Sequence, residues 1–239
     1  MNLILDQGNT NLKIYFFCKN KIEEKFIFPI ENFDLSFILK DKVEHIIYST
    51  VSGIDNYFFN YFNDKKITTF NLSTPLPIIN KYEAKTIGLD RLAGVSGASE
   101  IFPETNVLVI DIGSAITYDL ITKNKEFLGG NISPGLKLRY KSLNNYTVNL
   151  PLIEPEDIDY NIGKTTEQAI RAGVQKGILY EIESYINDLS KDYENLRIIL
   201  TGGDADFFAK KIKYSIFAEP NLVAIGLNKI LNYNIEEQI

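Results

Sequence analysis

A phrase of acidic and glycine residues occurs twice in this chain, and its residue types suit phosphate binding. The copies, Asp6-Gln7-Gly8-Asn9-Thr10 and Asp111-Ile112-Gly113-Ser114, each lie between two apolar runs. A glycine in such a turn lets the backbone approach a ligand closely and offers amide donors to an anion. A neighbouring carboxylate can hold a metal ion on that anion's far side. Two such strand–turn–strand units predict two related half-domains around a nucleotide-phosphate cleft.

The first copy extends to Lys13, a point charge that can reach phosphates. In phosphoryl transfer the protein mainly positions groups and neutralises charge, so Asp6 could coordinate Mg²⁺ while Gly8 to Thr10 bind phosphate oxygens. A Gly-Asn pair is also ordinary hairpin chemistry. The repetition of the phrase favours the functional interpretation.

The second copy continues into Thr117 and Asp119, which share a face of the following strand because side chains alternate along it. Asp111 could bind a cation and Ser114 could donate to a phosphate. A capped turn without function is the alternative.

A third motif, Gly88-Leu89-Asp90-Arg91, precedes a predicted helix. The helix dipole favours a charged Asp90, which makes it a weak base. A loose phosphoryl-transfer transition state needs little early proton removal, so a weak base that orients a hydroxyl suffices. Arg91 offers a fork suited to a carboxylate. An N-cap with a surface ion pair is the alternative for this pair.

The apolar patterns predict mixed α/β lobes, since strands in threes followed by helices occur twice. We predict domains at 1–103 and 104–239, and interpret Gly129-Gly130 as a turn. The aromatic stripe at 54–62 is either core or subunit contact. The predicted strands are 2–6, 11–17, 22–28, 44–49, 67–72, 106–111, 116–122, 125–129 and 196–200; the predicted helices are 32–41, 54–62, 89–101, 134–145, 165–189, one from 204, and 221–231.

The composition indicates a globular, cytoplasmic protein. The chain has 239 residues and a net charge of −6, which argues against a nucleic-acid partner. The single cysteine, Cys18, suits a reducing compartment. No apolar run approaches the roughly 20 residues that cross a bilayer, so no membrane partner is expected. His45 lies on an apolar strand and is interpreted as structural.

Five motifs in this order resemble type III pantothenate kinase, a branch of the actin, sugar kinase and Hsp70 superfamily. The resemblance runs from residue 2 to about 231 and implies two similar ribonuclease H-like lobes, with mixed sheets flanked by helices and a ligand cleft between them. The motifs are Asp6 to Lys13, Gly88-x-Asp90-Arg91, Asp111-x-Gly113-Ser114-Ala115-x-Thr117-x-Asp119, Gly129-Gly130-x-Ile132-x-Pro134-Gly135 and Thr201-Gly202-Gly203.

The resemblance implies ATP-dependent phosphorylation of pantothenate to 4′-phosphopantothenate by a homodimer, with Asp90 as proton acceptor. Asp111 would bind potassium or ammonium, and Asp6 would bind Mg²⁺. Pantothenate would contact Tyr82, Gly88, Leu89, Asp90, Arg91 and Thr166. ATP would contact Asp6, Gln7, Gly8, Asn9, Thr10, Asn11, Leu12, Lys13, Ser114, Gly202 and Gly203.

The chain departs from the family pattern at two points. Ser114 stands where the family usually has Thr, and no Asn-Pro lies between Tyr82 and Gly88. Two alternatives remain: another small-molecule kinase or a nucleotide phosphohydrolase on the same fold, and a catalytically silent accessory protein that retains nucleotide binding.

Overall fold

The computed structural model describes residues 1–8, 10–31, 33–50, 56–83 and 86–236, and it divides into two compact units. The first unit comprises Met1–Pro103 together with the segment from Asn221 onward, and the second comprises Glu104–Pro220. The first predicted domain therefore ends where the first unit's main segment ends. The predicted second domain, 104–239, differs from the structure because the last helix belongs to the first unit.

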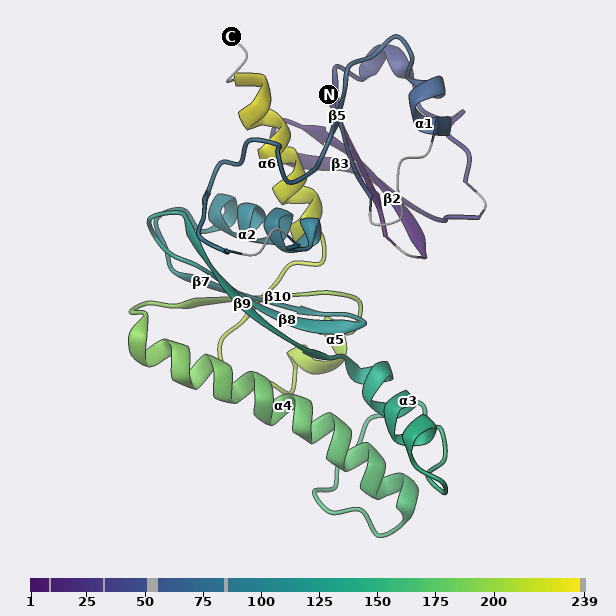
Figure 1. The fold of residues 1–239 in the computed structure, drawn as a ribbon, viewed down its shortest axis with the longest axis vertical. Helices are drawn as coiled ribbons and strands as arrows, with labels where there is room; N and C mark the ends of the chain where they lie inside the picture. The colour runs from purple at the N-terminus through teal and green to yellow at the C-terminus, as the bar shows by residue number, and fades with distance from the viewer. Residues whose placement is uncertain (9, 32, 51–55, 84–85, 237–239) are drawn as a thin grey trace. The chain divides into compact units, whose positions relative to one another are not determined.

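The sheet of the first unit has the order β3-β2-β1-β4-β5 (Figure 1). β1, β2 and β3 are antiparallel neighbours, whereas β4 runs parallel to β1 and β5 parallel to β4. The strands are β1 (Asn2–Gln7), β2 (Asn11–Cys18), β3 (Lys21–Pro29), β4 (His45–Thr50) and β5 (Ile67–Thr69).

One face of this sheet carries an apolar core. Leu3, Leu5 and Ile14 point into it because alternate residues of a strand share a face. Phe58, from α1 (Asn56–Tyr61), and Phe62 are both 0% exposed there, so the described part of the aromatic stripe is core. Residues 54 and 55 of that predicted helix lie outside the described residues.

On the other face, α6 (Leu222–Glu236) contacts β1 and β4, and α2 (Leu89–Ile101) packs closely on α6. A Cβ at Gly226 would lie 1.7 Å from the Ala93 carbonyl oxygen, and one at Gly97 would lie 2.5 Å from the Leu222 carbonyl oxygen. Only hydrogen fits at either position. Asn228 of α6 also accepts a hydrogen bond from the Asn2 side chain (2.8 Å), which ties α6 to β1.

The second unit repeats this topology with the order β11-β10-β7-β8-β9. β7, β8 and β9 are antiparallel neighbours, β10 is parallel to β7, and β11 is parallel to β10. This repetition confirms the predicted mixed α/β class with two related halves. The strands are β7 (Val107–Ile112), β8 (Ala115–Ile121), β9 (Glu126–Pro134), β10 (Arg197–Thr201) and β11 (Phe217–Ala218).

Helices α3 (Leu136–Tyr146), α4 (Thr166–Asp192) and α5 (Ala205–Ala209) pack on this second sheet. Figure 1 shows α4 lying along one face of it. Ile178 and Ile182 of α4 are buried in the same cluster as Ile110 of β7. This core holds the strand that carries Asp111.

Two local predictions are wrong. The helix predicted over 32–41 does not form between Phe33 and Leu39, and only the 3₁₀ turn Lys40–Lys42 follows. The reason is that Asp34 accepts a hydrogen bond from the Ser36 amide (2.8 Å), which competes with helical pairing. Gly129-Gly130 is not a turn but lies inside β9, where a Cβ at Gly130 would lie 1.9 Å from the Tyr118 carbonyl oxygen.

The structure adds the two-residue strand β6 (Ile79–Asn80). None of the helices in the described ranges is long and apolar enough to cross a membrane.

The contact between α2 and α6 predicts the effect of Gly226→Ala. The added methyl meets the Ala93 carbonyl, and overpacking of this kind costs roughly 1–3 kcal/mol of unfolding free energy. Gly173 of α4 is the matched control because a Cβ there meets nothing within 4 Å. Gly173→Ala should stabilise by up to about 1 kcal/mol through helix propensity. Urea denaturation of both variants measures the difference; equal stability would contradict the contact.

Candidate functional site

The first hairpin places Asp6 of β1 directly opposite Lys13 of β2. Their charged atoms, Asp6 Oδ2 and Lys13 Nζ, are 4.0 Å apart. The Gly8 amide donates to the Asn11 carbonyl (3.0 Å) and closes the turn. Burial raises the pKa of Asp6, Lys13 opposes this rise, and the charge of Asp90 adds to it. Asp6 and Asp90 therefore lie within electrostatic reach of each other in the first unit.

Two residues of the predicted phosphate segment turn their side chains away from the turn. The Gln7 side chain accepts a hydrogen bond from the Tyr48 hydroxyl, and Leu12 is 0% exposed in the apolar core. Side-chain contacts of Gln7 and Leu12 with a nucleotide are therefore excluded by this geometry, and only their backbone is available. Thr10 is exposed, whereas Asn9 lies outside the described residues.

Asp90 is the second residue of α2, and its carboxylate is exposed at the positive end of that helix. Its Oδ1 accepts a hydrogen bond from the Arg91 amide (2.9 Å). The N-cap is Gly88, which makes no side-chain cap. A Cβ at Gly88 would lie 2.4 Å from Asp90 Oδ1, so the glycine makes room for this carboxylate. The simple N-cap alternative for Asp90 is therefore wrong.

Arg91 is buried, and its guanidinium lies over the Tyr82 ring, with 5.3 Å between the carbon Cζ and the ring centroid. Such cation–π contacts hold a planar guanidinium in a fixed orientation. The Tyr82 amide donates to the Asn80 side chain (3.0 Å). The structure thus brings together Tyr82 and Arg91, two of the predicted site residues. It adds Asn80, which was not predicted; an Asn that bonds the backbone two residues later is a common turn pattern, and that pattern could have indicated it.

In the second unit, Asp111 lies opposite Thr117 of β8 and beside Thr201 of β10. The Gly113 amide donates to the Ala115 carbonyl (3.0 Å), as Gly8 does to Asn11 in the first turn. Gly202 has φ of 101°, and a Cβ there would lie 2.4 Å from both Asp111 Oδ1 and the Ile112 carbonyl oxygen. The Thr201–Gly203 turn is therefore packed directly against the acidic turn.

A further glycine, Gly135, packs on the other side of that acidic turn. Its amide donates to the Ser114 carbonyl (3.1 Å), and a Cβ on it would lie 2.0 Å from the Gly113 carbonyl oxygen. The Pro134-Gly135 pair was predicted to start a helix and belongs to one of the five family motifs, but its packing on the acidic turn was not predicted. Asp204 was also missed: its amide donates to the Ile112 carbonyl (2.9 Å), and burial raises the pKa of its carboxyl, with Lys137 opposing.

A polar network anchors the Pro134–Gly135 segment. Glu181 of α4 accepts hydrogen bonds from Tyr118 (2.8 Å), Arg139 (2.6 Å) and Ser133. Burial acts to raise the pKa of Glu181, but these three donors outweigh burial and leave the pKa lowered. Arg139 also donates to the Pro134 carbonyl (2.7 Å). This network connects α3, α4 and the end of β9 beside the acidic turn.

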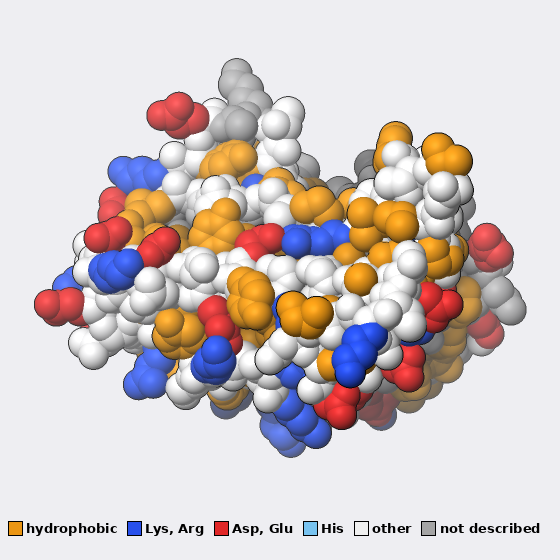
Figure 2. Space-filling view, turned by 90° about the horizontal axis from the view of Figure 1, so that it is seen from below, with side chains coloured by type: hydrophobic (Ala, Val, Ile, Leu, Met, Phe, Trp, Pro, Cys, Tyr) orange, Lys and Arg blue, Asp and Glu red, His pale blue; other side chains and the backbone are white. Residues whose placement is uncertain are grey.

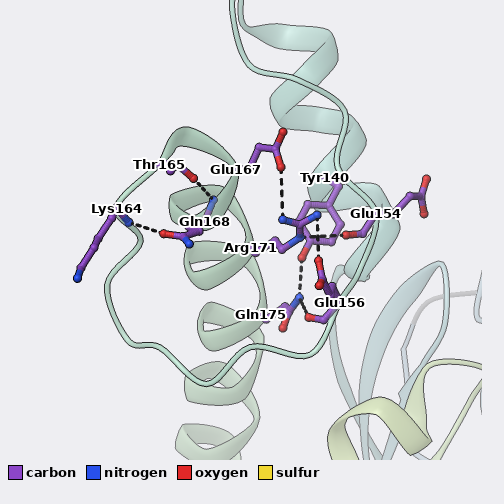
Figure 3. Close-up of polar contacts among 9 residues, drawn as sticks. All are labelled: Tyr140, Glu154, Glu156, Lys164, Thr165, Glu167, Gln168, Arg171 and Gln175. Atoms are coloured by element: carbon purple, nitrogen blue, oxygen red, sulfur yellow. Dashed lines mark hydrogen bonds and ion pairs between the residues drawn. The ribbon is translucent and has the colours of Figure 1, made fainter.

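Thr165 and Thr166 have different roles at the start of α4. The Thr165 hydroxyl accepts a hydrogen bond from the Gln168 amide (3.2 Å), and the Gln168 side chain accepts one from the Lys164 amide (2.9 Å), as Figure 3 shows. These two hydrogen bonds cap the start of α4, and the first of them engages the Thr165 hydroxyl. Thr166 is exposed and, with Arg139, lines a groove of about 620 Å³.

The part of the chain that the structure describes contains no cluster of three or more His, Cys, Asp or Glu side chains that could hold a metal. A cation at Asp6 or Asp111 would therefore be held by one or two protein carboxylates together with other oxygens. Mg²⁺ is commonly bound in this way with substrate phosphates.

Comparison with known proteins identifies relatives over the whole chain. A family model described as type III pantothenate kinase matches residues 2–188. The type III pantothenate kinase of Porphyromonas gingivalis is 41% identical over 241 residues, covering 98% of this chain and 99% of that protein. The one from Bacteroides fragilis is 42% identical over 239 residues and covers 98% of each chain.

Two solved structures show the same fold. A Campylobacter jejuni protein described as a Baf family transcriptional activator has a TM-score of 0.62 and 26% identity, covering 98% of this chain and 99% of that chain. A glucokinase from an Antarctic psychrotroph has a TM-score of 0.52 and 12% identity, covering 97% and 98%, which shows the fold alone. The predicted relation to the sugar kinase fold is confirmed.

The raised pKa of Asp6 predicts that Asp6→Asn stabilises the protein at pH 7. A folded-state pKa above the unfolded value means that the folded chain binds more protons between the two values, so stability falls as pH rises through that interval. Asparagine removes this penalty, and the gain should vanish as the pH falls to the ordinary value of 3.8. Thermal unfolding at pH 7 and at successively lower pH measures the gain, with the exposed Asp64→Asn as control. A loss of stability at pH 7 would contradict the burial of Asp6.

Proposed function

The chain belongs to the type III pantothenate kinase family, and from this we propose how its residues divide the work of the reaction. The enzyme transfers a phosphoryl group from ATP to pantothenate, in coenzyme A biosynthesis. In the proposed mechanism, Asp90 accepts the proton of the pantothenate hydroxyl. The observation that carries this proposal is the exposed Asp90 carboxylate, which accepts a hydrogen bond from the Arg91 amide and lies within electrostatic reach of Asp6.

Asp90 is suited to orient a hydroxyl rather than to remove a proton early. Its Oδ1 is held by the Arg91 amide, which leaves the other carboxylate oxygen, Oδ2, for the substrate. Asp90 lies in the first turn of α2, at the positive end of the helix dipole. A loose transition state develops negative charge before the hydroxyl must lose its proton, and a weak, well-placed base is then sufficient.

Arg91 and Tyr82 are proposed to hold the carboxylate end of pantothenate. The Arg91 guanidinium is already oriented by the Tyr82 ring, so little conformational freedom is lost on binding. Gly88 and Leu89 shape the same helix start, and Gly88 cannot carry a side chain without displacing Asp90. Thr166 is proposed to contact pantothenate through its free hydroxyl, because Thr165 is committed to the helix cap.

Each unit is proposed to carry nucleotide-binding residues of its own. Asn9, Thr10, Asn11 and Lys13 would bind the phosphates of ATP in the first unit, and Gly8 would shape the turn through the hydrogen bond from its amide to the Asn11 carbonyl oxygen. Ser114, Gly202 and Gly203 would contact the nucleotide in the second; a Cβ at Gly203 meets nothing within 4 Å, so its backbone is open to approach. Gln7 and Leu12 contribute backbone only.

Two cations are part of the proposal. Asp6 fits Mg²⁺ because burial and the nearby charge of Asp90 both raise the pKa of its carboxyl. A divalent cation would offset that unfavourable negative charge. When bound, Mg²⁺ neutralises charge on the transferring phosphate. Asp111 fits potassium or ammonium, since its carboxylate lies against the Gly202 backbone with the Ile112 carbonyl oxygen nearby.

A cytoplasmic homodimer completes the proposal. The second unit exposes apolar side chains that a partner subunit would cover, among them Ile132 (63%), Val148 (97%) and Ile162 (79%). In the space-filling view of Figure 2, apolar side chains lie among both acidic and basic ones.

Asp90→Asn should lower kcat by about 10²–10⁴-fold, the range typical of general-base catalysis. The KM for pantothenate and the thermal unfolding midpoint should remain within about twofold and a few degrees of the wild type, since the side chain is exposed and isosteric. A coupled assay with ATP, Mg²⁺ and pantothenate measures this, with the exposed Glu83→Gln as control. Near-normal turnover of Asp90→Asn would dismiss the base assignment.

Turnover should depend on potassium or ammonium and fall when sodium is the only monovalent cation. Asp111→Asn should lose this dependence, giving the same low rate in both salts, because the carboxylate that favours the cation is gone. Asp188→Asn, at an exposed position of α4, is the control. No turnover of the wild type in any of these salts would favour the silent accessory alternative.

A further inference from the structure

Arg139 of α3 and Glu181 of α4 form an ion pair that lies outside the residues proposed to take part in the reaction. Their charged atoms, Nη2 of Arg139 and Oε2 of Glu181, are 2.6 Å apart, and the two side chains are 20% and 24% exposed. Salt screens a partly buried pair weakly, and a short charge-assisted hydrogen bond has a well-defined geometry. From this pair a series of contacts leads to the second acidic turn (residues 111–114).

The guanidinium of Arg139 connects Glu181 to the end of β9. Nη2 donates to Glu181 Oε2 and to the Ser133 hydroxyl (3.2 Å), while Nε donates to the Pro134 carbonyl oxygen (2.7 Å). The planar guanidinium fixes the directions of its N–H groups relative to one another. Holding Nη2 on Glu181 therefore determines where Nε holds the Pro134 carbonyl. Glu181 acts on Pro134 through Arg139.

Pro134 and Gly135 lie directly against the second acidic turn. Pro134 is opposite Ala115 in the register of β9 with β8, and the Gly135 amide donates to the Ser114 carbonyl oxygen (3.1 Å). A Cβ on Gly135 would be 2.0 Å from the Gly113 carbonyl oxygen and 2.7 Å from that of Ser114. The two backbones touch with no space between them, so a displacement of Gly135 must move the peptide that joins Gly113 and Ser114.

Gly202 holds the earlier residues of the same turn. A Cβ there would lie 2.4 Å from Asp111 Oδ1 and 2.4 Å from the Ile112 carbonyl oxygen. The turn is therefore held by backbone contacts at both of its ends. Arg139 supports the end that carries Ser114.

We propose that Arg139 and Glu181 are positioning residues for the ligands of the second acidic turn. The proposal rests on the proposed function, in which Asp111 holds a monovalent cation and Ser114 contacts the nucleotide. The ion pair touches neither ligand. It fixes the peptide between Gly113 and Ser114, and loosening that peptide misplaces the groups that bind both ligands. Even a displacement of about 1 Å is costly at such a site.

Arg139→Met tests this role, because methionine keeps an unbranched apolar stem and removes the guanidinium. In the coupled assay, the half-saturating potassium concentration and the KM for ATP should each rise by about tenfold, the expected effect of a lost charge-assisted hydrogen bond on an equilibrium constant. The KM for pantothenate should stay within about twofold of the wild type, which separates the positioning of this turn from a general loss of binding.

Arg139→Lys keeps the positive charge, but a single ammonium nitrogen cannot take the places of both Nε and Nη2. It should raise the same two constants by about threefold or more, the effect of one lost hydrogen bond. Wild-type constants in Arg139→Lys would overturn the proposal, because charge alone would then be sufficient. This variant remains decisive if Arg139→Met fails to fold.

Glu181→Gln should also raise both constants, since the amide lacks the charge that holds Arg139. The double variant Arg139→Met/Glu181→Gln should show no further rise over Arg139→Met, because Glu181 acts through Arg139. Arg171→Met is the matched control. The Arg171 side chain is 18% exposed and pairs with Glu156 across 3.3 Å, as Figure 3 shows. Its loss should lower the thermal unfolding midpoint to a similar extent but leave both constants unchanged.

Hydrogen–deuterium exchange of the ligand-free, full-length chain gives a readout that does not need turnover. The Gly113 amide donates to the Ala115 carbonyl oxygen (3.0 Å), and the Gly135 amide donates to that of Ser114. Peptides covering 111–116 and 131–137 should exchange about tenfold faster in Arg139→Met, because local opening becomes easier. Arg171→Met should leave these peptides unchanged. Absence of turnover in the wild type would contradict the proposed function, and the exchange result would still decide whether the ion pair holds the turn.

Three further results would overturn the proposal. The first is unchanged exchange of both peptides in Arg139→Met. The second is a rise in the KM for pantothenate as large as that for ATP, since Arg139 would then contact pantothenate from the groove that it lines with Thr166. The third is an equal rise of the potassium and ATP constants in Arg171→Met, because the effect would then be a general loss of stability.

Discussion

The backbone contact between α2 and α6 is the constraint on which the first unit's site depends. Gly226 lies so close to the Ala93 carbonyl that a methyl group would be 1.7 Å from it. This contact presses α2 onto a helix that is itself bound to β1 through Asn228 and Asn2. The start of α2 is thereby held relative to β1, and Asp90 comes within electrostatic reach of Asp6. A loosely packed helix would allow the two carboxylates to separate and relieve their repulsion.

The two halves share one topology, but their acidic turns have different surroundings. Each turn begins with an acidic residue one position before the end of its strand. Each is closed by a hydrogen bond of 3.0 Å that a glycine N–H donates to a backbone carbonyl. In the first turn Asp6 faces Lys13, and their charged atoms are 4.0 Å apart. In the second turn Asp111 faces Thr117 and is enclosed by Gly202. The proposed monovalent-cation site is therefore packed against backbone, whereas the proposed magnesium site faces a lysine.

Rigid support for the second turn comes from residues distant from it. Gly135 packs on the Gly113 carbonyl, and Arg139 holds Pro134 through the polar network around Glu181. Burial and the bond to Glu181 both raise the pKa of Tyr118, so the phenol remains a donor throughout the physiological range. A fully bonded network of this kind defines one arrangement of α3, α4 and β9, since breaking any bond leaves a buried polar group unsatisfied.

The sequence by itself determined the repeated acidic turns, the main strands, the long helices and the position of Asp90 and Arg91 at a helix start. These follow from strand alternation, glycine turns and helix-start chemistry, which act between near neighbours in the chain. Tertiary structure alone decided that the last helix joins the first unit, because the contact of Gly226 with Ala93 is invisible to local patterns. It also decided that Gln7 and Leu12 face the core, that Gly129-Gly130 continues a strand against Tyr118, and that Thr166 rather than Thr165 is left free. In each case the deciding partner is a group brought close only by packing, so its steric and hydrogen-bonding demands could not be inferred before the fold was known.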